Sequence, residues 1–164
     1  MISTHSLFEN KINQVKDIWD LMRPIKYENT TKNYIIKTPT EVLKSKRAIC
    51  YDQVELERQE FKKIKYKFKT FFFYDPDPNT YLPTHTVLIF KENNKYFWFE
   101  NSWGKYRGVH GPYSSYNSAC NFIASKLKLD QQLKTVKIIE YQEFNYRGLS
   151  IREFQKAIHI GRLK

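Results

Sequence analysis

The segment THTVLIFKENNKYFWFENSW, residues 84–103, constrains the fold most, because two apolar stretches are separated there by an Asn-Asn dipeptide. Residues 84–90 and 95–101 are rich in β-branched and aromatic side chains, which is typical of strands. Asn93 and Asn94 suit a two-residue turn, whose backbone needs positive φ angles that asparagine tolerates better than most residues. The segment therefore predicts an antiparallel hairpin.

Residues 64–74 predict a third strand next to this hairpin. Lysine alternates there with mostly apolar residues at period two: Lys63, Lys65, Lys67 and Lys69 against Ile64, Tyr66, Phe68 and Thr70. Such alternation places the lysines on one face of a strand and the apolar side chains on the other. We expect the lysine face to serve solubility and the protection of a sheet edge, in preference to contact with nucleic acid.

Helical patterns precede these strands. Apolar residues recur at helical spacing over about residues 5–23. Thr38 begins a capping-box pattern that predicts a short helix over residues 39–45. A third helix should begin near Cys50, because acidic residues crowd its first turns and lysines close it, which is the charge order that the helix dipole favours.

The rest of the chain predicts another helix and another strand. The helix is indicated by apolar residues at helical spacing, namely Tyr116, Ala119, Cys120, Ile123 and Leu127. Residues 134–144 resemble a strand, residues 104–115 a loop, and residues 150–160 a helix or an irregular tail. This order predicts an α+β fold, with N-terminal helices packed on a central antiparallel sheet and residues 1–164 forming one domain.

Composition narrows the classes of function. A hydrophobic content of 41% indicates a folded globule, and the net charge of +11 would attract anionic partners at low salt. No aromatic residue alternates with Lys63, Lys65, Lys67 and Lys69 on their face to stack bases, so we expect nucleic-acid binding to be weak and non-specific at most. No apolar run resembles a signal peptide or reaches membrane-spanning length, which predicts a cytoplasmic protein without a membrane partner.

The two cysteines, Cys50 and Cys120, are too few for a disulfide framework and are expected to be free thiols. Cys120 lies among apolar residues of a predicted helix, which favours a place in the core. Cys50 lies where a loop enters a helix, and a helix N-terminus lowers the pKa of a thiol. Neither cysteine has a second cysteine or a histidine at ligand spacing, so neither a metal nor another cofactor is expected.

A nucleophilic Cys50 needs a histidine, and the chain offers four. His5 and His159 lie close to the two ends of the sequence. His110 lies in a predicted loop, from which it could line a pocket. His85 is the favoured partner because it begins the predicted strand over residues 84–90.

The third member of a triad depends on the length of the hairpin turn. A two-residue turn pairs Glu92 with Lys95 and puts Glu100 on the face of His85, whereas a three-residue turn puts Asn101 opposite His85. Both residues remain candidates for orienting the imidazole. Glu100 is favoured, because Asn-Asn suits the two-residue turn.

A cysteine at a helix start, a histidine at a strand start and an acid or amide on the next strand resemble the transglutaminase-like superfamily of papain-like cysteine enzymes. PTEVLKSKRAICYDQVELE resembles the family's helix, basic turn and nucleophile segment, and HTVLIFKENNKYFWFE resembles its histidine strand and the strand that follows. ENSWG is similar to the NSWG of papain-type proteases, where the asparagine orients the histidine. The resemblance covers about residues 35–115. Ala48 departs from the family's usual glycine, and no glutamine six or so residues before Cys50 offers an oxyanion donor.

The resemblance implies a transglutaminase-like domain that acts on an amide or peptide bond of a protein or peptide substrate. Cys50 would be the nucleophile, His85 the general base and acid, and Glu100 or Asn101 the orienting residue. A thioester intermediate would pass to water in a protease, amidase or deamidase, or to an amine in a transglutaminase; hydrolysis is favoured. The alternative is a binding module with a degenerate site that contacts nucleic acid or an acidic protein through its basic surface.

Overall fold

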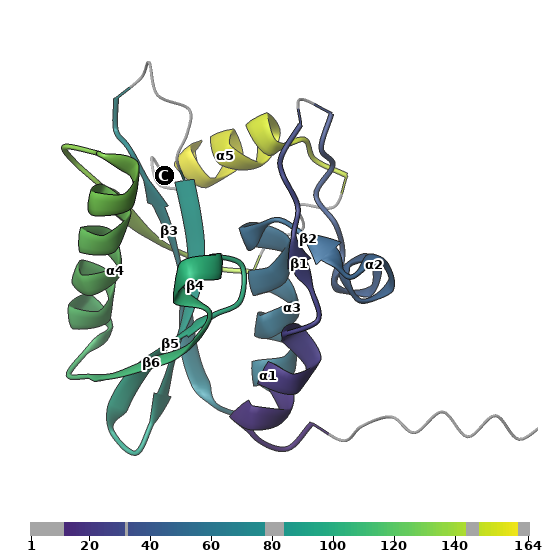
Figure 1. The fold of residues 1–164 in the computed structure, drawn as a ribbon, viewed down its shortest axis with the longest axis vertical. Helices are drawn as coiled ribbons and strands as arrows, with labels where there is room; N and C mark the ends of the chain where they lie inside the picture. The colour runs from purple at the N-terminus through teal and green to yellow at the C-terminus, as the bar shows by residue number, and fades with distance from the viewer. Residues whose placement is uncertain (1–11, 32, 78–83, 144–147, 161–164) are drawn as a thin grey trace, which may run out of the picture.

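The structure is a computed structural model that describes residues 12–31, 33–77, 84–143 and 148–160 (Figure 1). The described residues form an α+β fold. Its elements are α1 (Val15–Met22), β1 (Lys26–Tyr27), α2 (Pro39–Ser45), β2 (Arg47–Ala48), α3 (Cys50–Lys63), β3 (Lys67–Tyr74), β4 (Thr84–Glu92), β5 (Lys95–Glu100), the 3-10 turn η1 (Gly104–Tyr106), β6 (Gly108–Tyr113), α4 (Tyr116–Gln131), β7 (Lys137–Tyr141) and α5 (Ile151–Ile160). No helix among these residues is both long enough and apolar enough to cross a membrane.

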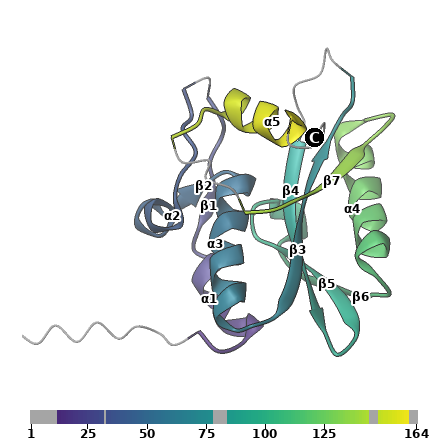
Figure 2. The same cartoon turned by 180° about the vertical axis from the view of Figure 1, so that it is seen from behind.

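A five-stranded antiparallel sheet in the order β6-β5-β4-β3-β7 is the centre of the fold. Helices α1, α2, α3 and α5 lie on one side of this sheet and α4 lies on the other, as Figures 1 and 2 show from opposite directions. The sheet therefore separates two hydrophobic clusters. The cluster on the α3 side includes Leu56, Phe61, Leu88, Phe90 and Phe99, and the cluster on the α4 side includes Phe73, Val87, Trp98, Cys120 and Ile123.

The predicted hairpin is confirmed. Asn93 and Asn94 have φ angles of 50° and 58°, the positive values that a type I′ turn requires. Glu92 pairs with Lys95 across this two-residue turn, and β4 and β5 keep that register as far as Leu88 opposite Phe99. The turn length therefore decides which side chains of β5 share a face with those of β4.

The third strand is confirmed in place, and its lysine-rich start lies outside the pairing with β7. Strand β3 begins at Lys67, three residues later than predicted, and Lys65 just before it has a φ of 59°. Strand β7 flanks β3 on the side away from β4, but it pairs only with Thr70–Tyr74, so Lys67 and Lys69 lie outside this pairing. Lys69 pairs at 3.0 Å with Glu140 of β7. The structure therefore leaves an edge only at the lysine-rich start of β3, whereas the rest of the strand is internal.

The first helix is shorter than its periodicity predicted. Residues 12–14 are not helical, and α1 begins at Val15. The Asp17 carboxylate accepts hydrogen bonds from the backbone N–H groups of Asn13 at 2.9 Å and Gln14 at 3.0 Å, which fixes the start of the helix there. The earlier part of the predicted helix, including His5, lies outside the described residues.

Residues 104–115 were predicted to be a loop, but they contain the edge strand β6. Gly108 and Gly111 have φ angles of 133° and 134°, values that other residues rarely adopt. A Cβ atom at Gly111 would lie 2.7 Å from the backbone oxygen of Tyr96 on β5, so the close approach of the two strands needs glycine. Glycine and proline are depleted in strands, so the presence of Gly108, Gly111 and Pro112 explains why the sequence pattern indicated a loop.

Candidate active site

Cys50 is the first residue of α3 and is partly buried. The chain reaches it through β2, which pairs in parallel with β1 so that Tyr27 lies opposite Ala48. The side chain of Gln53 donates a hydrogen bond at 2.9 Å to the backbone oxygen of Ala48, which ties the turn before the helix to the helix itself. These contacts fix the position of the thiol relative to the sheet.

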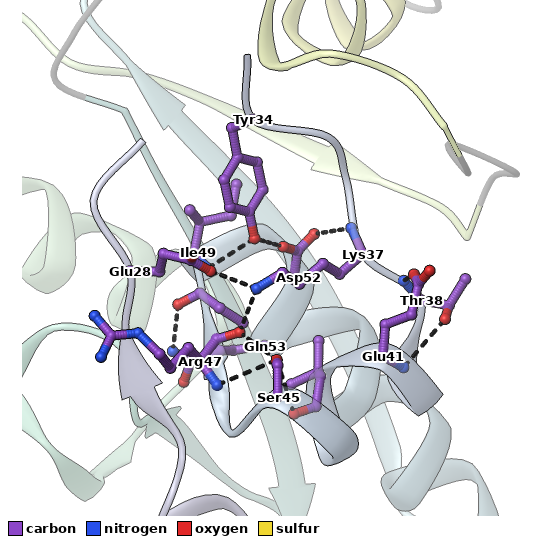
Figure 3. A network of polar contacts seen from close by, with 12 residues as sticks. Glu28, Tyr34, Lys37, Thr38, Glu41, Ser45, Arg47, Ile49, Asp52 and Gln53 are labelled. Carbon is purple, nitrogen blue, oxygen red and sulfur yellow. Dashed lines mark hydrogen bonds and ion pairs between the residues drawn. The ribbon is translucent and has the colours of Figure 1, made fainter. Parts of the chain in front are cut away.

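A buried polar network further holds the start of α3 (Figure 3). The Asp52 carboxylate accepts hydrogen bonds from the Tyr34 hydroxyl and, at 3.1 Å, from the backbone N–H of Lys37. The Tyr34 oxygen also accepts a hydrogen bond of 3.4 Å from the N–H of Ile49, the residue before Cys50. Burial raises the pKa of Asp52 to about 7, against the opposing effect of these hydrogen bonds. The segment around residues 34–37 thereby helps to hold the start of the helix at Cys50.

The structure brings His85 to Cys50. His85 is buried near the start of β4, opposite Phe73 of β3; it lines the same cavity as Cys50, and its hydrogen bonding and charge lower the pKa of the Cys50 thiol. His85 Nε2 lies 2.7 Å from Oε2 of Glu100, which leaves Nδ1 as the ring nitrogen for Cys50. Thiol, imidazole and carboxylate thus form one continuous chain.

Glu100 is buried and both of its oxygens are fully engaged. Besides the His85 bond, Oε2 accepts one of 3.2 Å from the Trp98 indole. Oε1 accepts three hydrogen bonds, from the backbone N–H and the hydroxyl of Ser102 at 2.7 and 2.9 Å and from the N–H of Trp103 at 2.8 Å. A carboxylate with this many donors is held in one orientation and kept ionised.

The charges of the three residues support one another. Burial opposes ionisation of all three groups. The charge of Glu100 and the hydrogen bonds to both neighbours nevertheless raise the pKa of His85, and His85 in turn lowers the pKa of Glu100. The hydrogen bond and charge of His85, together with contacts to Thr86, lower the pKa of Cys50. The arrangement favours a thiolate–imidazolium pair.

Asn101, the other candidate for orienting the imidazole, lies against different partners. Its side-chain N–H₂ group donates to the backbone oxygen of Ile25 at 3.1 Å and to Oε1 of Gln53 at 2.7 Å, and its oxygen accepts from Arg107 at 3.0 Å. These bonds join β5 to α3 and to the chain after α1. Glu100, the residue favoured by the two-residue turn, is the one that contacts His85.

A cavity of about 640 Å³ opens next to the thiol. Cys50 and His85 line it together with aromatic and polar side chains, among them Tyr27, Ser102 and Trp103. Trp103 also contacts the His85 ring, with ring centroids 5.2 Å apart. Trp103 thus forms part of the cavity wall, whereas Trp98 is wholly buried.

The remaining candidates lie elsewhere. Cys120 is buried in the cluster under α4, as its apolar neighbours predicted. His110 does not line this cavity: it lies on β6, where Nε2 contacts the backbone oxygen of Tyr106 and the ring packs on Trp98. The side chain of His159 lies outside the described residues.

Sequence reasoning missed two partners of the site. Ser102, which donates twice to Glu100, follows it by two residues, but a turn geometry of this kind has no sequence signature. Glu57 is buried seven residues after Cys50, two helical turns along α3, and its Oε2 has no hydrogen-bond partner. Burial and the charge of Glu100 raise the pKa of Glu57 well above the usual range. The seven-residue spacing could have indicated it.

Within the part of the chain that the structure describes, no three His, Cys, Asp or Glu residues are grouped to hold a metal ion. Compared with models of protein families and with curated proteins, the sequence matches none.

Proposed function

We propose that this protein is a cysteine-dependent acyl-transfer enzyme that acts on an amide or peptide bond, as a protease, amidase or deamidase on a transglutaminase-like core. The observation that carries the proposal is the chain of contacts from Cys50 through His85 to Glu100 at the edge of an open cavity. The pairing of a thiol with a histidine that a third group orients is the arrangement that activates a cysteine nucleophile.

In the proposed reaction, the Cys50 thiolate attacks the carbonyl carbon of the substrate. The tetrahedral intermediate collapses with cleavage of the C–N bond, and the His85 imidazolium gives its proton to the leaving amine, or to ammonia if the bond is a side-chain amide. Water then attacks the thioester while His85 takes one of its protons. Cleavage of the S–C bond releases the acid and restores the thiolate–imidazolium pair.

Glu100 would keep His85 in place through these steps. Because its Oε2 accepts from Nε2, the imidazole presents Nδ1 to the thiol and cannot rotate without losing a buried charge-assisted hydrogen bond. The four hydrogen bonds from Trp98, Ser102 and Trp103 hold the carboxylate itself. Glu100 is therefore a positioning and charge-stabilising residue.

The oxyanion of the intermediate would bind at the start of α3. The first N–H groups of a helix have no acceptor within the helix, and the helix dipole places partial positive charge there. The N–H of Gln53 is already bonded to Ile49, so the available donors are those closest to Cys50. Such N–H groups are the usual donors of an oxyanion hole.

The proposal can be tested on a mixed peptide library. The wild-type protein is incubated with peptides from a digested proteome, and new termini, Gln or Asn deamidation and ammonia are measured by mass spectrometry and enzymatic assay. Cys50→Ala is the control, and Cys120→Ala is the matched variant of the other thiol. Products that depend on Cys50 and survive loss of Cys120 support the proposal; identical product profiles for wild type and Cys50→Ala contradict it.

A further inference from the structure

The charged side chains that line the cavity are all positive. Two of its lining residues, Lys26 and Arg107, are cationic and exposed, and no Asp or Glu belongs to the described residues that line it. The site's own carboxylate, Glu100, is buried against His85 and is not part of the lining. A substrate in this cavity therefore meets two positive charges that no lining carboxylate neutralises.

Arg107 is held in place by the protein backbone and a buried amide. Its Nη2 donates to the backbone oxygen of Arg23 at 2.6 Å and to Oδ1 of Asn101 at 3.0 Å, and its guanidinium lies 5.7 Å from the centre of the Trp19 ring. None of these partners carries a negative charge. Asn101 is buried, and its own bond to Gln53 ties it to the helix that begins with Cys50. The guanidinium is thus oriented while its charge stays available.

Lys26 supplies the second charge from the segment that lies beside the nucleophile. Its backbone N–H donates at 2.9 Å to the oxygen of Lys46, and it pairs with Arg47 in the short parallel ladder that leads to Cys50. No ion pair joins its ammonium group to a described carboxylate, unlike Lys37, which pairs with Glu28 nearby. The ladder fixes the backbone of Lys26, and the side chain is exposed at the cavity.

We infer that the acyl donor of this enzyme carries a carboxylate next to the bond that is attacked, as an acidic peptide does. This inference rests on the function proposed above and adds a substrate class to it. Two uncompensated cations beside a cavity stabilise a bound anion and raise its local concentration, and both effects weaken with salt. A neutral or cationic acyl donor gains neither effect.

Iodoacetate and iodoacetamide provide a direct test, because they alkylate the same thiol and differ chiefly in one negative charge. Their rates with Cys50 are measured at pH 6 by peptide mass spectrometry, with glutathione as the reference thiol. The ratio of the two rates cancels changes in the thiol itself. We expect the ratio to be higher for Cys50 than for glutathione, and to fall by about two- to fivefold in Lys26→Gln and in Arg107→Gln, the size of one charge at 4–8 Å in water.

Lys95→Gln is the matched control, since it removes the same charge from the exposed end of the β4–β5 turn. It should keep the wild-type ratio. Lys26→Gln is informative even if Arg107→Gln fails to fold, because the Lys26 side chain is exposed. A parallel comparison of p-nitrophenyl hydrogen succinate with p-nitrophenyl acetate extends the measurement to acylation, and added salt should lower both ratios.

The outcomes separate the two claims. If Cys50 is reactive but both cavity variants keep the wild-type ratio, the inference about the substrate is overturned and the proposed function stands. If Cys50 reacts with iodoacetamide no faster than glutathione at pH 6, the proposed function is overturned and the inference falls with it. A ratio that falls in both cavity variants and not in Lys95→Gln supports both claims.

Discussion

The imidazole of His85 donates from Nε2 to Oε2 of Glu100 at 2.7 Å, between two strands joined by a two-residue turn. This bond commits one ring nitrogen to a buried carboxylate and directs the other toward Cys50. Because the carboxylate is fully engaged, the imidazole gains both an orientation and a raised pKa. The reactivity proposed for Cys50 depends on this pair of residues.

Replacing Glu100 with Gln should therefore reduce the reactivity of Cys50. The neutral amide no longer stabilises the imidazolium, so the pKa of His85 falls and that of Cys50 rises. We expect the rate of alkylation by iodoacetamide at pH 6 to fall by about tenfold, which corresponds to about one pKa unit of the thiol. The pH dependence of the rate, measured from pH 5 to 10, should shift toward higher pH.

Asn101→Ala is the comparison for that variant. It removes the donor to the buried Oε1 of Gln53, so it should lower the free energy of unfolding by ~1–3 kcal/mol. The titration of Cys50 should shift far less than in Glu100→Gln. If Asn101→Ala instead produces the larger shift, Asn101 and not Glu100 orients the imidazole.

The two cysteines should differ strongly in reactivity. The pKa of Cys50 is lowered by His85 in spite of burial, whereas burial raises the pKa of Cys120 to about 12. At pH 7, iodoacetamide should modify Cys50 first and leave Cys120 unmodified until the protein unfolds. Peptide mapping of briefly treated protein measures this order. Equal labelling of both thiols in the folded protein would be inconsistent with the electrostatics described.

Asp52→Asn should change how stability depends on pH. The pKa of the buried carboxyl is about 7, above its ordinary value of 3.8, so the folded protein binds a proton that the unfolded chain has lost between these pH values. The contribution of protonated Asp52 to the free energy of unfolding is fully present below about pH 4. It is lost as the pH rises toward 7, at ~1.4 kcal/mol per pH unit at most. Relative to wild type, the variant should thus gain stability from pH 4 to 7. Urea unfolding at several pH values measures this difference, and parallel curves would contradict it.

Phe61→Ala should be among the most destabilising substitutions in the protein. Phe61 is fully buried on α3, and its ring lies 5.1 Å from that of Phe90 and 5.5 Å from that of Phe99. Loss of the ring leaves a cavity between helix and sheet, for which we expect ~3–5 kcal/mol of lost stability. Leu129→Ala is the control, because Leu129 is 69% exposed and should change stability little. Chemical denaturation of the two variants compares them.

The sequence was sufficient to predict those features that depend on neighbouring residues. Thr38 and Glu41 predicted the capping box that the structure contains, with hydrogen bonds of 3.3 and 2.7 Å. Asn93 and Asn94 predicted the turn, and the turn fixed the register that puts Glu100 on the face of His85. Once the length of the turn is known, the alternation of side chains between the two faces of a strand is enough to predict which residues share a face.

Features that depend on distant residues could not be predicted in the same way. The bond from Tyr34 to Asp52 joins residues 18 positions apart through an irregular segment, and no periodicity marks it. Strand β6 depends on Gly111 being able to approach Tyr96, a contact that exists only once β5 is in place. The position of β7 beside β3 likewise follows from how α4 crosses the sheet.

Formation of an acyl-enzyme on Cys50 tests the central claim most directly. Wild-type protein is mixed with p-nitrophenyl acetate at pH 7, and the release of p-nitrophenol is followed while the acetyl group is located by mass spectrometry. We predict a rapid burst approaching one equivalent, with an acetyl thioester on Cys50 that then hydrolyses. In His85→Asn, we expect both the burst and the thioester to form more slowly than in wild type. A wild-type protein without a burst, or one in which His85→Asn acylates Cys50 as fast as wild type, would contradict the account.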